Sequence, residues 1–206
     1  IKREEFVLYK KRFERVLAKM EERGLEQILV MDPNSIWYLT GYQNNPMERF
    51  YALYISASGN HMMFMNKLFP VPNTDLECVW FTDTDDYIGI LASKVDSEKT
   101  LGVDKVMTAS FLVPLMEHNP NCKYVLASDC VDEVRAVKDE TEQGLMRDVS
   151  LINDKVMESV ESFIHEGVTE EEIASKMLDI YKSLGADGYS FEPLVGFGAN
   201  CALGHH

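Results

Sequence analysis

The apolar periodicity of the sequence changes abruptly after Cys130, and this change limits the folds that the chain can adopt. Before it, short apolar runs of strand length alternate with helical patterns, which is typical of an α/β domain. After it, apolar residues recur at steps of three and four, as on one face of a long helix: Leu145, Val149, Ile152, Val156, Val160 and Phe163. We therefore predict two domains with a boundary near Asp132, residues 1–131 and residues 132–206.

The first domain is predicted to begin with a helix and to continue with several strands. Charges alternate with apolar residues at helical steps over residues 6–20, and Gly24 is expected to end this helix. Short apolar runs bounded by turn residues then predict the strands. These runs cover residues 27–31, 51–56, 61–66, 77–81, 101–103 and 124–128. The second and third form a predicted hairpin, because Gly59 between them can adopt a positive φ.

Two capping boxes are predicted in the second domain. Asp139 precedes Glu142 by three residues, and Thr169 precedes Glu172 by the same spacing. In a capping box each of the two side chains accepts a hydrogen bond from the backbone N–H at the other position. The second helix should end at Gly185, since glycine adopts the left-handed C-terminal cap without steric cost.

The charge of the chain argues against nucleic-acid and membrane partners. Lys and Arg number 20, Asp and Glu number 34, and the formal charge is -14. Such a surface repels nucleic-acid phosphates and anionic lipids. No apolar run approaches the roughly 18 residues of a membrane span, and the charged first five residues do not resemble a signal peptide. We therefore expect a cytoplasmic protein with a small-molecule substrate.

Several residues that often carry chemistry are predicted to be structural in this chain. The cysteines lack the C-x-x-C spacing of a zinc or redox site, so we expect reduced thiols. Three histidines lack the spacing of metal ligands. A group of aspartates is interpreted as solvated charge on a loop, and an Asp-Pro pair is interpreted as a turn. These residues are Cys78, Cys122, Cys130 and Cys201; His61, His118 and His165; Asp83, Asp85 and Asp86; and Asp32-Pro33.

The last segment runs from strand-like residues at Phe191 through small residues to His205 and His206. Small residues permit close approach of backbones. Two histidines at the end of a chain are either a tag remnant or solvated tail, or a working acid, base or ligand. The residues alone leave both interpretations open.

Four patterns follow one another along the chain. They are Asp32-Pro33-Asn34-Ser35-Ile36-Trp37-Tyr38-Leu39-Thr40-Gly41-Tyr42; Asn45-Pro46-Met47-Glu48-Arg49-Phe50; Val134-Arg135-x-Val137-Lys138-Asp139-x-x-Glu142; and, after a Gly167-Val168-Thr169-Glu170 turn, Phe191-x-Pro193-x-Val195-x-x-Gly198-x-Asn200-x-Ala202-x-x-His205. Together they resemble the prolidase and aminopeptidase P family of Xaa-Pro-cleaving metallopeptidases. The resemblance implies a creatinase/prolidase-like N-terminal α/β domain with a mixed sheet, followed by the first part of a pita-bread catalytic domain.

The resemblance also implies a catalytic role for His205, beside two divalent metal ions, which are manganese, cobalt or zinc in such enzymes. There it donates a hydrogen bond to the tetrahedral intermediate, which forms when a metal-activated hydroxide attacks the bond before proline. The family's aspartate, histidine and glutamate ligands follow the position of His205. No metal ligand can therefore be assigned, and we do not expect these 206 residues alone to hydrolyse peptides.

The family resemblance implies a homodimer in which the loop with Glu48 and Arg49 approaches the catalytic site of the partner subunit. These two residues are therefore candidate substrate-binding residues, although a local surface ion pair explains them equally well. Met47 departs from the histidine often found at its position in the family, which argues against a direct substrate role there.

Two alternatives to a metal-dependent dipeptidase or aminopeptidase remain. Creatinase shares both domains and works without a metal, so a metal-independent hydrolase of that kind is one alternative. A non-catalytic binding or dimerisation module on the same fold is the other, because a fold does not by itself define a function.

Overall fold

The computed structural model describes residues 3–204. The chain divides into two compact units, with the boundary between Val137 and Lys138. Asp132, the predicted boundary, lies inside helix α5 (Asp129–Ala136), which packs into the core of the first unit. The domain limits drawn from the sequence stay a prediction. Among the described residues, no helix has the length and apolar character needed to cross a membrane.

A six-stranded mixed sheet forms the centre of the first unit, in the order β4-β3-β2-β1-β5-β6. The strands are β1 (Gln27–Val30), β2 (Ala52–Ser56), β3 (Met62–Asn66), β4 (Glu77–Phe81), β5 (Leu101–Val103) and β6 (Tyr124–Leu126). Strand β2 is antiparallel to both β1 and β3, whereas β4 runs parallel to β3, and β5 and β6 run parallel to β1. Each strand predicted for the first domain is confirmed, but β6 ends two residues early, because the chain turns there into α5.

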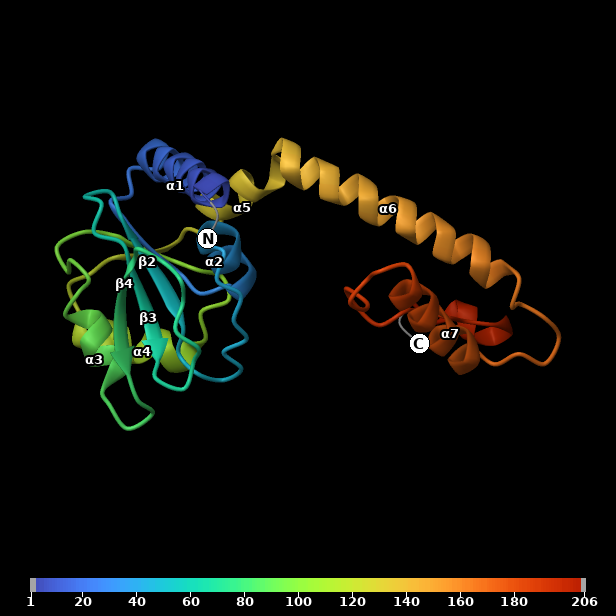
Figure 1. The fold of residues 1–206 in the computed structure, drawn as a ribbon. Helices are drawn as coiled ribbons and strands as arrows, with labels where there is room; N and C mark the ends of the chain where they lie inside the picture. Colours follow the sequence, from blue (N-terminus) through green and yellow to red (C-terminus); the bar gives the residue numbers. More distant parts are fainter. Residues whose placement is uncertain (1–2, 205–206) are drawn as a thin grey trace. The chain divides into compact units, whose positions relative to one another are not determined.

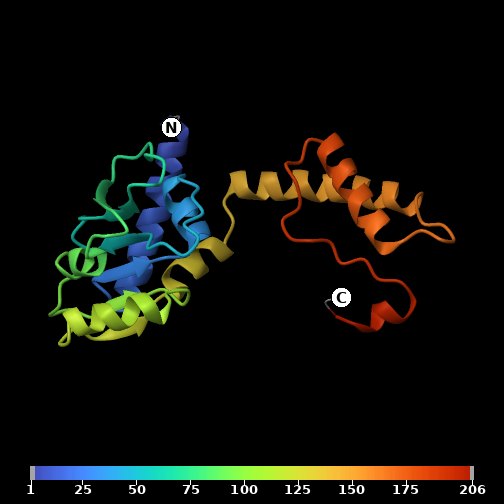
Figure 2. The same ribbon diagram turned by 90° about the horizontal axis from the view of Figure 1, so that it is seen from below.

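Alternation of side chains along the central strands creates two cores, one on each face of the sheet. On β1, Ile28 and Val30 pack against α1 (Arg3–Glu22), α2 (Pro33–Thr40) and α5, while Leu29 points into the other core. That second core is covered by α3 (Tyr87–Ala92) and α4 (Ala109–His118). Figures 1 and 2 show these two helix layers on opposite sides of the sheet. The central strands are therefore buried on both faces.

Two glycines in the first unit have a clear structural reason. Gly24, the second residue after α1, has φ +64, which confirms the predicted helix end. At Gly102 in β5, a Cβ atom would lie 2.5 Å from the Cβ of Ala127 and 2.7 Å from the Cγ2 of Ile28. Only glycine therefore lets β5 pack this closely beside β1 and the segment after β6.

Helix α2 differs from the prediction, because the Asp32-Pro33 turn leads directly into it. Asp32 is its N-cap and accepts a hydrogen bond from the Ser35 amide, and Pro33 occupies the first helical position. Proline suits this position, since its fixed φ is helical and the first turn has no use for its missing N–H. The helix ends at Gly41 with φ +72.

The second unit contains two helices, α6 (Glu140–Glu161) and α7 (Glu170–Ser183), and the 3₁₀ turn η1 (Gly198–Ala202). Both capping boxes are confirmed, at Asp139 and at Thr169, with reciprocal hydrogen bonds. The core between the helices consists of Val156, Val160 and Ile173. Gly185 follows α7 with φ +91, as predicted.

Two features of the second unit depart from the sequence pattern. The apolar stripe of α6 is covered by α7 only over its second half, so Leu145 and Val149 are 61% and 63% exposed. The strand-like run that begins at Phe191 forms no strand in the described residues, and the segment before η1 has no regular structure. A strand needs a neighbour to accept and donate its backbone hydrogen bonds, and no described strand of this unit supplies one.

Candidate functional site

The segment that leads toward His205 is tied to the first turn of α7. Glu170 accepts a hydrogen bond from the Phe197 amide at 2.6 Å, and both of its oxygens accept from the Asn200 side-chain amide, at 2.9 and 3.0 Å. Leu203 in turn donates its amide to the Asn200 carbonyl at 3.0 Å. His205 and His206 themselves lie outside the described residues, so the catalytic role of His205 stays a prediction.

The loop before β2 carries the two other candidate residues, Glu48 and Arg49. The Arg49 guanidinium contacts Asp83 through Nε and one terminal nitrogen, each at 3.3 Å, and Glu48 through the other at 3.0 Å. Asp83 is also held by the amide of buried Asn66 at 2.6 Å. All three guanidinium nitrogens thus have partners within the chain, and Arg49 fixes the loop. The Glu48 side chain remains 72% exposed.

The tip of this loop contains an uncommon backbone conformation. Met47 has φ +53 and is 78% exposed. A positive φ is costly for a residue with a bulky side chain. The Asn45 side chain accepts the Met47 amide at 3.2 Å, and the Arg49 amide donates to the Pro46 carbonyl at 3.0 Å. These hydrogen bonds hold the tight turn that presents Glu48.

The aspartates that follow β4 have partners within the chain. Asp85 accepts the Thr82 amide and hydroxyl at 2.6 and 2.8 Å, and these hydrogen bonds lower the pKa of Asp85. Asp86 is the N-cap of α3. Across residues 3–204, no group of three or more His, Cys, Asp or Glu side chains is arranged to hold a metal ion. The described residues therefore do not fit a metal centre, and no reaction step can be assigned to one.

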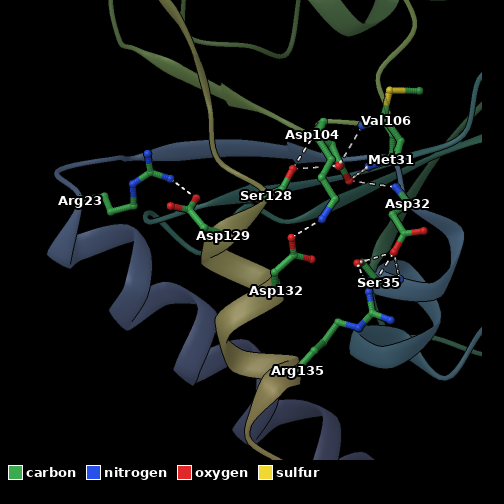
Figure 3. Close-up of polar contacts among 11 residues, drawn as sticks. Arg23, Met31, Asp32, Ser35, Asp104, Val106, Ser128, Asp129, Asp132 and Arg135 are labelled. Carbon is green, nitrogen blue, oxygen red and sulfur yellow. Dashed lines mark hydrogen bonds and ion pairs between the residues drawn. The ribbon is translucent and has the colours of Figure 1, made fainter.

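Sequence reasoning missed a polar network at the carboxyl ends of β1 and β5, which Figure 3 shows. Asp104, only 6% exposed, accepts hydrogen bonds from the amides of Met31 and Asp32 at 3.0 and 2.9 Å, and from the Ser128 hydroxyl at 3.0 Å. Arg135 of α5 pairs with Asp32 at 3.0 Å. The sequence did contain a signal for this network, because Asp32 and Asp104 each closely follow the end of a buried strand.

Ligands often bind at the carboxyl ends of parallel strands. In this protein the cavity beside the network measures about 10 Å³, which is room for about one water molecule. The network joins β1, β5 and α5 directly, and its polar groups bond one another around this small cavity. The network therefore stabilises the fold, and the cavity has room for little more than a water molecule.

A wider cavity of about 620 Å³ borders α1, the end of α2 and the loop before β4. His61 lies at its wall, where it accepts the Ser56 amide at Nδ1 and packs on Phe13, with ring centroids 5.1 Å apart. Burial lowers the pKa of His61. The arrangement is that of a neutral, packed histidine, as the sequence predicted, and the cysteines are free thiols, as also expected.

Comparison with known proteins agrees with this architecture. The fold is that of a mixed-sheet creatinase/prolidase-type N-terminal domain followed by the start of a pita-bread domain. The chain belongs to the creatinase/prolidase N-terminal domain family, which matches residues 12–137, and residues 144–206 match metallopeptidase family M24. The predicted family and the predicted α/β fold class with its mixed sheet are confirmed.

Solved structures and curated relatives of this kind are similar over almost the whole chain. The recombinant prolidase of Thermococcus sibiricus is 26% identical with a TM-score of 0.84, over 96% of this chain and 56% of that one. The Xaa-Pro dipeptidase of Bacillus anthracis, 22% identical with a TM-score of 0.80 over 96% of this chain and 55% of that one, shares the fold. An uncharacterized peptidase of Staphylococcus haemolyticus is 25% identical over 94% of this chain and 56% of its own length. The chain thus spans little more than half the length of these relatives.

Proposed function

We propose that the full-length protein hydrolyses the bond before proline in Xaa-Pro dipeptides, in a metal-dependent reaction. The likeness to the Thermococcus sibiricus prolidase over nearly the whole chain carries this proposal. The match of the second unit to a metallopeptidase family supports it. Two divalent ions, manganese, cobalt or zinc, would be held by ligands outside the described residues, which supply no metal centre of their own.

Three residues of this chain have distinct parts in the proposal. His205 donates a hydrogen bond to the tetrahedral intermediate. Glu48 contacts the dipeptide bound by the partner subunit of a homodimer, and Arg49 positions the loop that presents it. The exposure of the Glu48 carboxylate and the pairing of Arg49 with Asp83 support this division.

The test uses the purified full-length protein, stripped of metal with a chelator and then supplied with Mn²⁺, Co²⁺ or Zn²⁺. We expect hydrolysis of Leu-Pro only after metal is restored, and little hydrolysis of the matched dipeptide Leu-Ala. Hydrolysis that survives metal removal would instead indicate a creatinase-like, metal-independent enzyme. Absence of hydrolysis with every ion would indicate a non-catalytic module.

The proposed role of the loop has its own test. In the full-length enzyme, Glu48→Gln should raise KM for Leu-Pro several-fold, because a group that binds substrate affects ground-state binding. The matched control is Glu117→Gln, an exposed glutamate in the last turn of α4 with no hydrogen bond or ion pair to Glu48 or Arg49 in the described residues. Sedimentation should show a dimer for both variants; an unchanged KM in Glu48→Gln, or a monomeric active enzyme, would contradict the role across the dimer.

A further inference from the structure

We propose that Glu170 is a positioning residue, which holds the segment that carries His205 in its working place. This inference rests on the proposed function, since it assigns Glu170 a part in the same reaction. The observation is the contact between the first turn of α7 and residues far along the chain. One carboxylate binds the Phe197 amide and the Asn200 side chain, 27 and 30 residues away.

Glu170 holds a short stretch of backbone at two points, and a local turn hydrogen bond continues the ordered stretch to Leu203. Phe197 is held through its amide, Asn200 is held through its side chain, and the Asn200 carbonyl accepts the Leu203 amide. Cys201 adds a hydrogen bond from its thiol to the Gly196 carbonyl at 3.0 Å. Only Gly204 separates this stretch from His205 in the sequence. The Glu170 contact therefore orders the described segment that directly precedes His205 in the sequence.

The contact between Glu170 and Asn200 has the chemistry of a structural anchor rather than of a solvated surface contact. A carboxylate that accepts several N–H groups makes stronger hydrogen bonds than a neutral acceptor does. Glu170 lies in the first turn of α7, where the helix dipole favours a negative charge. Glu170 and Asn200 are both half-buried, in contrast to the exposed neighbour Glu171. No other described side chain holds this stretch through two of its residues.

A swap of functional groups tests the contact in the full-length enzyme. Asn200→Asp places a second carboxylate against Glu170, so the two groups repel. Glu170→Gln alone should be mild, because the Asn200 amide can turn its oxygen toward the new NH₂ group. In the double variant Glu170→Gln/Asn200→Asp, the glutamine amide donates to the aspartate, and the contact is rebuilt.

We expect Asn200→Asp to lower kcat for Leu-Pro by about 10-fold to 100-fold with little change in KM, since a displaced catalytic group costs on that order. The double variant should recover to within about 3-fold of the wild type, a non-additive result that marks a direct contact. The matched control, Glu171→Gln/Asn200→Asp, removes the same charge from the neighbouring residue and should not recover. Circular dichroism at the assay temperature checks that all variants are folded.

Amide hydrogen exchange over residues 196–204 provides a readout that does not depend on activity. Exchange should be faster in Asn200→Asp and return to the wild-type rate in the Glu170→Gln double variant only. Wild-type kinetics in Asn200→Asp, or equal rescue by Glu171→Gln, would overturn the proposal. An inactive wild type would overturn the proposed function, and the exchange pattern would then decide alone whether Glu170 anchors the segment.

Discussion

Removal of the Asp104 carboxylate should destabilise the first unit strongly. In Asp104→Ala, the amides of Met31, Asp32 and Val106 and the hydroxyl of Ser128 lose their acceptor. A hydrogen bond to a charged group contributes roughly 1.5–3 kcal/mol, and a buried donor left unpaired costs about 1–3 kcal/mol. Water can reach the less buried donors, so the free energy of unfolding should fall by about 3–4 kcal/mol rather than by the full sum.

Urea unfolding monitored by tryptophan fluorescence measures this change. The chain has two tryptophans, Trp37 and Trp80, and both lie in the first unit, so the signal reports on that unit alone. Asp104→Asn keeps one acceptor oxygen and should cost only about 1–2 kcal/mol.

A matched control is Asp129→Ala, which removes a half-exposed carboxylate that pairs with Arg23. Because exposed ion pairs contribute little, its cost should stay below about 1 kcal/mol. A loss below about 1 kcal/mol in Asp104→Ala would refute the reasoning that this carboxylate joins the strand ends.

Three further predictions concern stability. Gly102→Ala should destabilise the first unit by about 1–3 kcal/mol in the same titration, since its Cβ meets Ala127 and Ile28 at less than contact distance; an unchanged midpoint would contradict the packing. Folding lowers the pKa of His61, so below about pH 6.5 the unfolded chain binds a proton at this residue more readily than the folded chain does. The free energy of unfolding should therefore fall as the pH decreases. His61→Gln should flatten this decrease, and an identical pH profile would count against it. Thr169→Ala should lower the free energy of unfolding of the second unit by about 1 kcal/mol, because the side-chain N-cap of α7 is lost. Circular dichroism measures this change, and an unchanged stability would show that the capping box does not stabilise the helix.

Much of the secondary structure could be predicted, because its causes are local. The strand patterns, the helix end at Gly24 and the two capping boxes depend on residues within a few positions of one another. Helix α2 was missed because Asp32-Pro33 is read equally well as a turn or as a helix start. The strand-like run from Phe191 forms no strand for a different reason. A strand also requires a hydrogen-bonding partner outside its own sequence.

The candidate site divides in the same way. From the sequence alone, Glu48, Arg49 and the segment that leads to His205 are candidate site residues, through patterns that resemble a family of known enzymes. The sequence did not reveal which distant residues contact Arg49 and this segment. Asp83 pairs with Arg49 across 34 positions, and Glu170 reaches Asn200 across 30.

The sequence determined the kind of secondary structure and the family, since periodicity, caps and turn residues are properties of neighbouring positions. Only the tertiary structure decided that Asp104 joins the ends of β1 and β5 and that Glu170 holds the segment before His205. These contacts depend on the order of the strands and on where α7 meets the returning chain. A carboxylate can satisfy donors from distant residues only after packing has brought them within hydrogen-bond distance.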